Sequence, residues 1–168
     1  TGMEAIEGLL LEQVHSASKQ LVAMRTAEGD QLKKDIITHL SFIENMSEQL
    51  SKLGPTVVEA YRLRLEKKLK EYLGSQIDEQ RILAEAAIFA DKADINEELK
   101  RINSHLGQFT QSLQSADPVG RKLDFIVQEL NREVNTIGSK SNDANIANLV
   151  VEMKACLEKI KEQVQNIE

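Results

Sequence analysis

Apolar residues recur every three or four positions through most of this 168-residue chain, the spacing that places them on one face of a helix. Over residues 3–53 the spacing continues without a proline. It predicts one very long helix or two collinear helices, with Gly29 as the expected bend. At about 1.5 Å per residue such an element spans roughly 75 Å, so we expect it to project or to pack against other subunits. Its apolar positions are Leu10, Val14, Leu21, Met24, Leu32, Ile36, Ile43, Leu50 and Leu53.

Two glycines divide the part of the chain that follows. Gly54 and Pro55 are expected to end the long helix, because proline lacks a backbone donor and disfavours helical geometry in the residue before it. A second helix is predicted over residues 56–73, with Gly74 as its stop.

Aspartates mark the starts of the next two helices. Asp78 can cap a third helix over residues 79–93, whose alanine-rich middle would allow a neighbour to approach closely. Asp94 is followed three residues later by Glu97, which is the arrangement of a capping box. A fourth helix is therefore predicted over residues 95–115.

Two further helices are predicted near the carboxyl end. Asp117 and Pro118 mark a break, with Asp117 as the cap of a helix over residues 120–140 and Gly138 near its end. The last helix is expected to begin near Asp143. Its apolar positions alternate in steps of three and four, which is typical of a coiled-coil or bundle seam: Ile146, Leu149, Met153, Leu157, Ile160, Val164 and Ile167.

Composition supports an all-α fold. The chain has 8 glycines, 2 prolines, no tryptophan and 4% aromatic residues, whereas strands draw on aromatic residues and their turns on glycine and proline. We predict a long extended amino-terminal helical arm over residues 1–74, formed by the long helix and the second helix. A helical bundle over residues 75–168 follows it.

Charge and cysteine content narrow the function classes. The formal net charge of −6 argues against indiscriminate nucleic-acid binding, although a local basic patch remains compatible with it. The single cysteine, Cys156, lies on the apolar stripe of the last helix and is expected to be a buried thiol. No apolar run reaches the roughly 18 residues of a membrane span, so we expect a cytoplasmic protein without membrane contact.

The fourth predicted helix carries the side chains best suited to catalysis. Glu97, Glu98, Arg101 and His105 can converge on one face, and we take these four as candidate catalytic residues. Carboxylates with one imidazole suit Mn²⁺ or Mg²⁺, and the candidate ligands are Glu85, Asp91, Asp94, Glu98 and His105. An exposed helix with caps and ion pairs would show the same residue types, so a purely structural role remains an alternative.

The helix over residues 120–140 has a polar side of unusual chemistry. Amides, an aspartate and an arginine lie opposite its apolar stripe, which suits hydrogen bonding to a defined partner. For Arg132, pairing with Glu129 or Asp124 within the helix is the alternative. The candidate RNA-binding residues are Arg121, Lys122, Gln128, Asn131, Arg132 and Lys140.

Several stretches together resemble one protein family. They are ADKADINEELKRINSHLGQF at 90–109, GRKLDFIVQELNREVNTIGSKSND at 120–143 and EKIKEQVQNIE at 158–168, with MRTAEGDQL at 24–32 upstream. These sequence segments closely resemble the carboxy-terminal region of the YicC-like endoribonuclease family of bacteria. Members of the family have a further amino-terminal domain of sheet and helix, and this chain is expected to begin after most of it.

The resemblance implies a metal-dependent ribonuclease that cuts RNA internally and assembles as a ring-like homo-oligomer, a hexamer. In the mechanism we expect, a divalent ion on some of the candidate ligands activates water or stabilises the charge on the phosphorane. Arg101 and Arg132 would clamp phosphate oxygens. The alternative is a non-catalytic helical scaffold or RNA-binding adaptor, in which the same polar faces join subunits.

Overall fold

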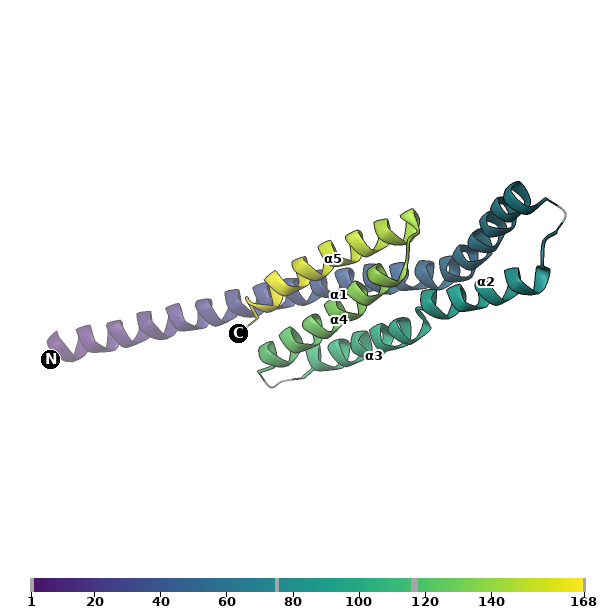
Figure 1. The fold of residues 1–168 in the computed structure, drawn as a ribbon. Helices are drawn as coiled ribbons and strands as arrows, with labels where there is room; N and C mark the ends of the chain where they lie inside the picture. The colour runs from purple at the N-terminus through teal and green to yellow at the C-terminus, as the bar shows by residue number, and fades with distance from the viewer. Residues whose placement is uncertain (1, 75, 116–117, 168) are drawn as a thin grey trace.

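The computed structural model describes residues 2–74, 76–115 and 118–167, and these residues form helices without a strand (Figure 1). The all-α prediction is confirmed, and so is the long amino-terminal helix. The elements are α1 (Gly2–Leu73), α2 (Glu79–Ala93), α3 (Asn96–Leu113), α4 (Gly120–Lys140) and α5 (Ala144–Val164).

The core lies between four helices. The middle of α1 packs against α3 and α5, α4 packs against both α3 and α5, and α2 contacts α1 (Figure 1). Residues of α1 between Ile36 and Val57 belong to the same hydrophobic cluster as the later helices. The largest fully buried side chains include Ile36, Ile43, Leu50, Ile102, Phe109, Leu123, Leu130, Ile137, Met153, Leu157 and Ile160.

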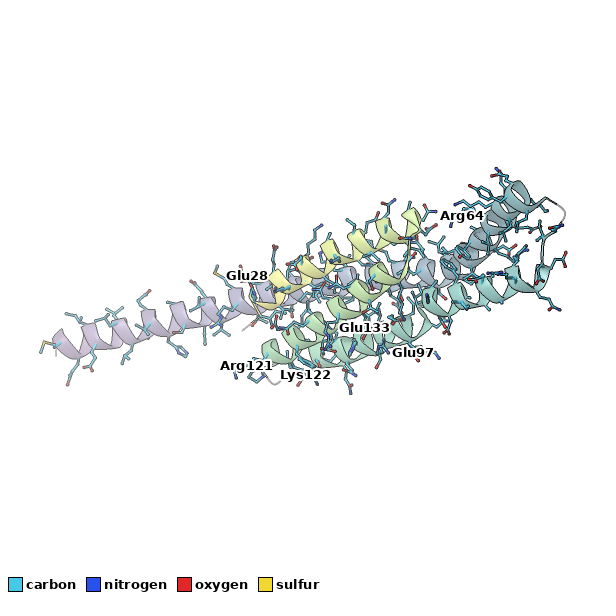
Figure 2. All side chains as sticks on the ribbon, viewed as in Figure 1. Glu28, Arg64, Glu97, Arg121, Lys122 and Glu133 are labelled. Carbon is cyan, nitrogen blue, oxygen red and sulfur yellow. The ribbon has the colours of Figure 1, made fainter. Side chains whose placement is uncertain are left out.

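Helix α1 continues through Pro55, so the prediction that Gly54 and Pro55 end it is wrong. Apolar residues on both sides of the proline, Leu50 and Val57, are buried in the core, and this packing offsets the cost of the missing backbone donor. The helix changes direction toward its carboxyl end, beyond the bundle (Figure 1). It passes Glu28, next to the bend expected at Gly29, without a visible kink (Figure 2).

The amino-terminal part of α1, residues 2–28, projects from the bundle, and we call this segment the arm; it is shorter than the arm over residues 1–74 that the sequence predicts (Figure 1). Residues 2–28 are all exposed. The arm nevertheless carries large apolar side chains with more than half of their surface exposed: Met3, Ile6, Leu9, Leu10, Leu11, Val14, Leu21, Val22 and Met24. Single exposed apolar residues are common, but a continuous series along one helix is typical of an interaction surface.

One of the three predicted caps is confirmed. Asp78 accepts a hydrogen bond from the backbone N–H of Gln80 at the start of α2. Asp143, expected from the sequence only as the approximate start of the last helix, is also a cap, because it accepts from the backbone N–H groups of Asn145 and Ile146 at the start of α5. Both aspartates satisfy donors that the first turn of a helix leaves without a partner.

The other two predicted caps, at the starts of α3 and α4, are not confirmed. Ile95 is the N-cap of α3, one residue later than expected. Asp94 still accepts from the Asn96 N–H at 2.9 Å, whereas Glu97 pairs with Arg101 instead of completing a capping box. Asp117 lies outside the described residues, and Val119 is the N-cap of α4.

The apolar seam of α5 is buried as predicted, with Ile167 partly buried against its end. Cys156 is buried beside it, which confirms the expected buried thiol. Its sulfur donates to the His39 carbonyl oxygen at 3.3 Å. Burial raises the pKa of the Cys156 thiol and outweighs the opposing charge of Lys159, so the thiol is a poor nucleophile. No described helix combines the length and the apolar character that crossing a membrane requires.

Alanine substitutions at two glycines test how tightly the helices pack. A Cβ atom at Gly107 in α3 would have no neighbour within 4 Å, whereas one at Gly138 in α4 would lie 3.2 Å from Val150 Cγ1. Gly107→Ala should raise the free energy of unfolding by about 0.5–1 kcal/mol, because alanine loses less backbone entropy in a helix. Gly138→Ala must also displace Val150 and should give a smaller gain or a loss. Urea unfolding of both variants measures this, and equal gains would contradict a close contact between α4 and α5.

Candidate functional site

Charged side chains from α3 and α4 meet where these two helices pack together. Lys140 Nζ donates to Glu98 Oε1 at 2.8 Å, and Arg101 Nε donates to Glu133 Oε1 at 2.8 Å. The other two nitrogens of Arg101 lie 3.3 Å from carboxylate oxygens of Glu97 and Glu98. We call these five residues the α3–α4 ion network: Glu97, Glu98, Arg101, Glu133 and Lys140.

The positions of these residues along two helices explain the network. Glu98 and Arg101 lie about one turn apart on α3, and Glu133 and Lys140 lie two turns apart on the facing side of α4. The two helices lie side by side and run in opposite directions, so Arg101 meets Glu133 while Glu98 meets Lys140 (Figure 1). Sequence reasoning missed Glu133. Its spacing of seven residues from Lys140 was the signal available.

Glu98 is the most deeply buried member, with 3% of its surface exposed. Burial by itself would raise the pKa of its carboxyl, but hydrogen bonding to Lys140 and the nearby charges of Lys140 and Arg101 hold it below the usual value. The carboxylate is therefore charged at neutral pH. Its Oε2 atom is buried without a hydrogen-bond partner.

The network includes two cations that were expected to contact RNA, Arg101 and Lys140. All three guanidinium nitrogens of Arg101 contact carboxylates, and hydrogen bonding to Glu133 raises the pKa of this already permanently charged group. Lys140 Nζ also donates to the carbonyl oxygen of Asp94 at 3.0 Å, so it joins α4 to the α2–α3 junction. In this arrangement both cations hold helices together, and Arg101 would have to leave a carboxylate to clamp a phosphate. Figure 2 shows Glu97 and Glu133 on these neighbouring helices.

His105 lies one turn beyond Arg101 on α3, outside the ion network. The residue is half-buried, and its Nδ1 atom is buried without a hydrogen-bond partner. A buried polar atom without a partner loses its hydration with nothing in return, so each one requires an explanation. Of the four candidate catalytic residues, His105 is the one that no described hydrogen bond or ion pair occupies.

The candidate metal ligands do not form one site. Among the described residues, no three histidine, cysteine, aspartate or glutamate side chains come close enough to hold a metal ion. Glu85 and Asp91 are exposed on α2, Asp94 caps the Asn96 N–H, and Glu98 is engaged by Lys140. The described donor set therefore does not fit a Mn²⁺ or Mg²⁺ ion held by this chain alone.

The candidate RNA-binding cations lie apart from one another. Arg121 and Lys122 are exposed in the first turn of α4 (Figure 2). Lys140 lies at the opposite end of this helix, about 28 Å away along its axis, within the ion network. Arg132 lies between them and pairs with Glu129 at 3.1 Å, which is the alternative considered from the sequence.

The amides on α4 are divided between exposed and partly buried positions. Gln128 is exposed and donates to Asp124 Oδ2 at 2.9 Å, one turn earlier on the same helix. Asn131 is half-buried. The polar side of α4 thus satisfies part of its hydrogen bonding internally, and the roles of these residues in RNA binding stay predictions.

Comparison with known sequences decides the family. A family described as "Endoribonuclease YicC-like, C-terminal" matches residues 50–168, a span that includes α2 to α5 and all five residues of the ion network. The chain belongs to the YicC-like endoribonuclease family. This confirms the resemblance noted in the sequence.

Two similar relatives bear the same printed name, "Probable endoribonuclease YicC". The one from Clostridioides difficile is 48% identical over 162 residues, which cover 95% of this chain and 55% of the relative. The one from Haemophilus influenzae is 37% identical over 168 residues, which cover 99% of this chain and 58% of the relative. Similarity to YicC-like proteins thus extends over the arm, and the chain spans little more than half the length of these relatives.

The buried carboxylate gives a test of the ion network. Lys140→Met removes the cation nearest to Glu98 and should lower the free energy of unfolding by about 2 kcal/mol. This is less than for a fully buried pair, because the Lys140 side chain is 33% exposed. Urea unfolding measures the change. Lys122→Met, an exposed cation on the same helix, is the matched control and should stay within about 0.5 kcal/mol of the wild type.

The same carboxylate should appear in the pH dependence of stability. Because the pKa of Glu98 is lower in the folded protein than its ordinary value of 4.5, its charge stabilises the fold above that value. This contribution is lost as the pH falls through the folded pKa. Glu98→Gln should therefore flatten the decrease in unfolding free energy below about pH 4.5. An unchanged acid profile would mean that Glu98 is not held as a charged group.

Proposed function

We propose that this chain takes part in the internal cleavage of RNA, as an endoribonuclease. The observation that carries the proposal is the family match over residues 50–168, together with two relatives named as probable endoribonucleases. Because the chain spans little more than half of those relatives, the activity, the RNA substrate and the partners are all part of the proposal.

Within the matched region, His105 is the side chain best suited to proton transfer. Its buried Nδ1 has no partner, and the neighbouring charged residues are already paired with one another. A neutral imidazole can accept the proton of an attacking oxygen, and such general base catalysis contributes about 10²- to 10⁴-fold in rate. Glu98 and Arg101 would then act as positioning residues that keep α3 fixed against α4.

Metal dependence is the part of the expectation that this chain supports least. Mn²⁺ or Mg²⁺ would stabilise charge on the reacting phosphate, but the described residues do not assemble a donor set for either ion. We therefore assign no step to a metal. Cleavage by the purified protein with and without a chelator would decide the question.

Self-association is a further part of the proposal. The exposed apolar residues of the arm would be covered if copies of this chain joined along it, in keeping with a ring-like homo-oligomer such as a hexamer. A cytoplasmic location and an RNA partner are expected for the same protein. Each of these is a proposal that rests on the family match.

A non-catalytic scaffold or RNA-binding adaptor is the second candidate. The observation that favours it is the ion network itself. Glu98, Arg101 and Lys140 form ion pairs with one another, as residues do whose role is to stabilise the fold. RNA cleavage distinguishes the two candidates, since a scaffold binds or assembles without cutting.

Cleavage of an internally labelled RNA tests the role of His105. His105→Ala should lower the rate at least a hundredfold while leaving the far-ultraviolet circular dichroism and the oligomeric state unchanged. His15→Ala, the same change on the exposed arm, is the matched control and should cut at the wild-type rate. Full activity in His105→Ala would place the chemistry elsewhere. Loss of assembly in that variant would make His105 a structural residue.

Light scattering tests the arm. Leu10→Gln combined with Val14→Gln removes two exposed apolar side chains one turn apart and should lower the average mass in solution. Glu12→Gln combined with Lys19→Gln changes only polar groups of the arm and serves as the control. A wild-type protein that is monomeric at the concentrations used would contradict a role for the arm in self-association.

A further inference from the structure

A cleft of about 750 Å³ lies between the carboxyl end of α1, α2 and the turn that leads into α5. Its volume is in the range of ordinary ligand sites, and none of the five residues of the α3–α4 ion network lines it. Six residues of α1 line it, and their spacing places them on one face of the helix: Val57, Ala60, Tyr61, Arg64, Leu65 and Lys68. Phe89 of α2 lines the same cleft.

The wall of the cleft contains a stacked aromatic pair. The rings of Tyr61 and Phe89 have centroids 3.9 Å apart and planes inclined by 6°. The whole chain has only 2 tyrosines and 4 phenylalanines, so two of its six aromatic rings meet here. Both residues are partly exposed. Flat aromatic surface at the wall of an open cleft is the surface on which nucleobases stack.

Two cations contribute to the same cleft as the aromatic pair. Arg64 and Lys68 lie one turn apart, about 6 Å along the axis of α1, and line the same cleft. Figure 2 places Arg64 beside the amino-terminal end of α5. In the described part of the chain no carboxylate pairs with either of them. By contrast, Arg62 and Lys70 on the same helix are engaged by Glu59 and Glu66, and these contacts lower the pKa of both glutamates.

Among the described residues that line the cleft, Asp143 is the one acidic side chain. Its carboxylate is occupied by the start of α5, where Oδ1 accepts from the backbone N–H groups of Asn145 and Ile146. It therefore repels anions at one side of the cleft and leaves the side formed by Arg64 and Lys68 positive. In a chain with a net charge of −6, this is a local site for an anion that also carries a flat apolar group.

We propose that this cleft binds single-stranded RNA, with bases stacked against the Tyr61 and Phe89 rings and neighbouring phosphates on Arg64 and Lys68. The proposal rests on the proposed function, because RNA is the substrate that the family implies, but it assigns RNA binding to a surface separate from His105. It explains how an acidic protein can bind a strand: one face of α1 supplies the positive charge and one ring of the stacking surface, and Phe89 of α2 supplies the other ring.

The experiment measures binding of a fluorescent single strand by anisotropy. A 2′-O-methyl oligouridine of about ten nucleotides, which resists cleavage, is titrated at several salt concentrations. Arg64→Gln combined with Lys68→Gln should weaken binding at least tenfold at low salt. It should also reduce the slope of log affinity against log salt by about 1.4, or 0.7 for each phosphate contact. Lys33→Gln combined with Lys34→Gln removes the same charge from exposed positions of α1 and should leave the slope unchanged.

Stacking is tested separately from charge. Tyr61→Leu should weaken binding about tenfold without changing the salt slope, whereas Tyr61→Phe should retain wild-type affinity, because the ring and not the hydroxyl supplies the contact. Circular dichroism and thermal unfolding show whether each variant is folded. If Tyr61→Leu does not fold, the Arg64 and Lys68 variant still decides the proposal.

The possible outcomes separate the cleft from the catalytic proposal. Wild-type affinity and slope in the Arg64 and Lys68 variant would overturn the cleft as an RNA site, and so would a wild-type protein that fails to bind the strand. An altered oligomeric state with unchanged RNA affinity would make the cleft a protein surface and would also overturn it. Cleavage of unmodified RNA by the wild type is measured independently, so the endoribonuclease proposal stands or fails on that result alone.

Discussion

One mismatch of length determines the shape of this protein. Helix α1 has 72 residues, or about 108 Å, whereas α4 and α5 each have 21, or about 32 Å. The later helices can bury only the middle of α1, between Ile36 and Val57, so both of its ends must extend beyond the core. The amino-terminal end becomes the exposed arm, and the carboxyl end, together with α2, forms the wall of the cleft. Both surfaces that we assign to binding therefore follow from the same packing.

Ion pairs hold α3 and α4 together in the region that matches the family. A carboxylate as buried as Glu98 requires a partner, and Lys140 supplies it from the far end of α4. Arg101 adds a second connection through Glu133. Because these charged groups pair with each other, His105 is the remaining candidate for proton transfer. The positive charge proposed to bind phosphate comes from Arg64 and Lys68 of α1. We therefore propose separate surfaces for proton transfer and for RNA binding.

Local signals in the sequence predicted the parts of the fold that depend on local physics. Asp78 was predicted as a cap because capping acts within one turn, and the α5 seam was predicted from its spacing. The helix end predicted at Pro55 was wrong because the free-energy cost of a proline in a helix is local, whereas the burial that offsets this cost comes from helices far along the chain. The pairing of Glu133 with Arg101, and the failure of the metal ligands to converge, depend on how α3 faces α4. Spacing within one helix does not contain that information.

The central proposal is that this helical chain binds single-stranded RNA at the α1–α2 cleft and at the face of α3 that carries His105. Photo-crosslinking of an RNA containing 4-thiouridine, followed by mass spectrometry of the crosslinked peptides, tests it most directly. The account predicts crosslinks to peptides that contain Tyr61 or Phe89, and to a peptide that contains His105. Crosslinks confined to the arm or to α5, or none above those of an unrelated acidic helical protein, would contradict it.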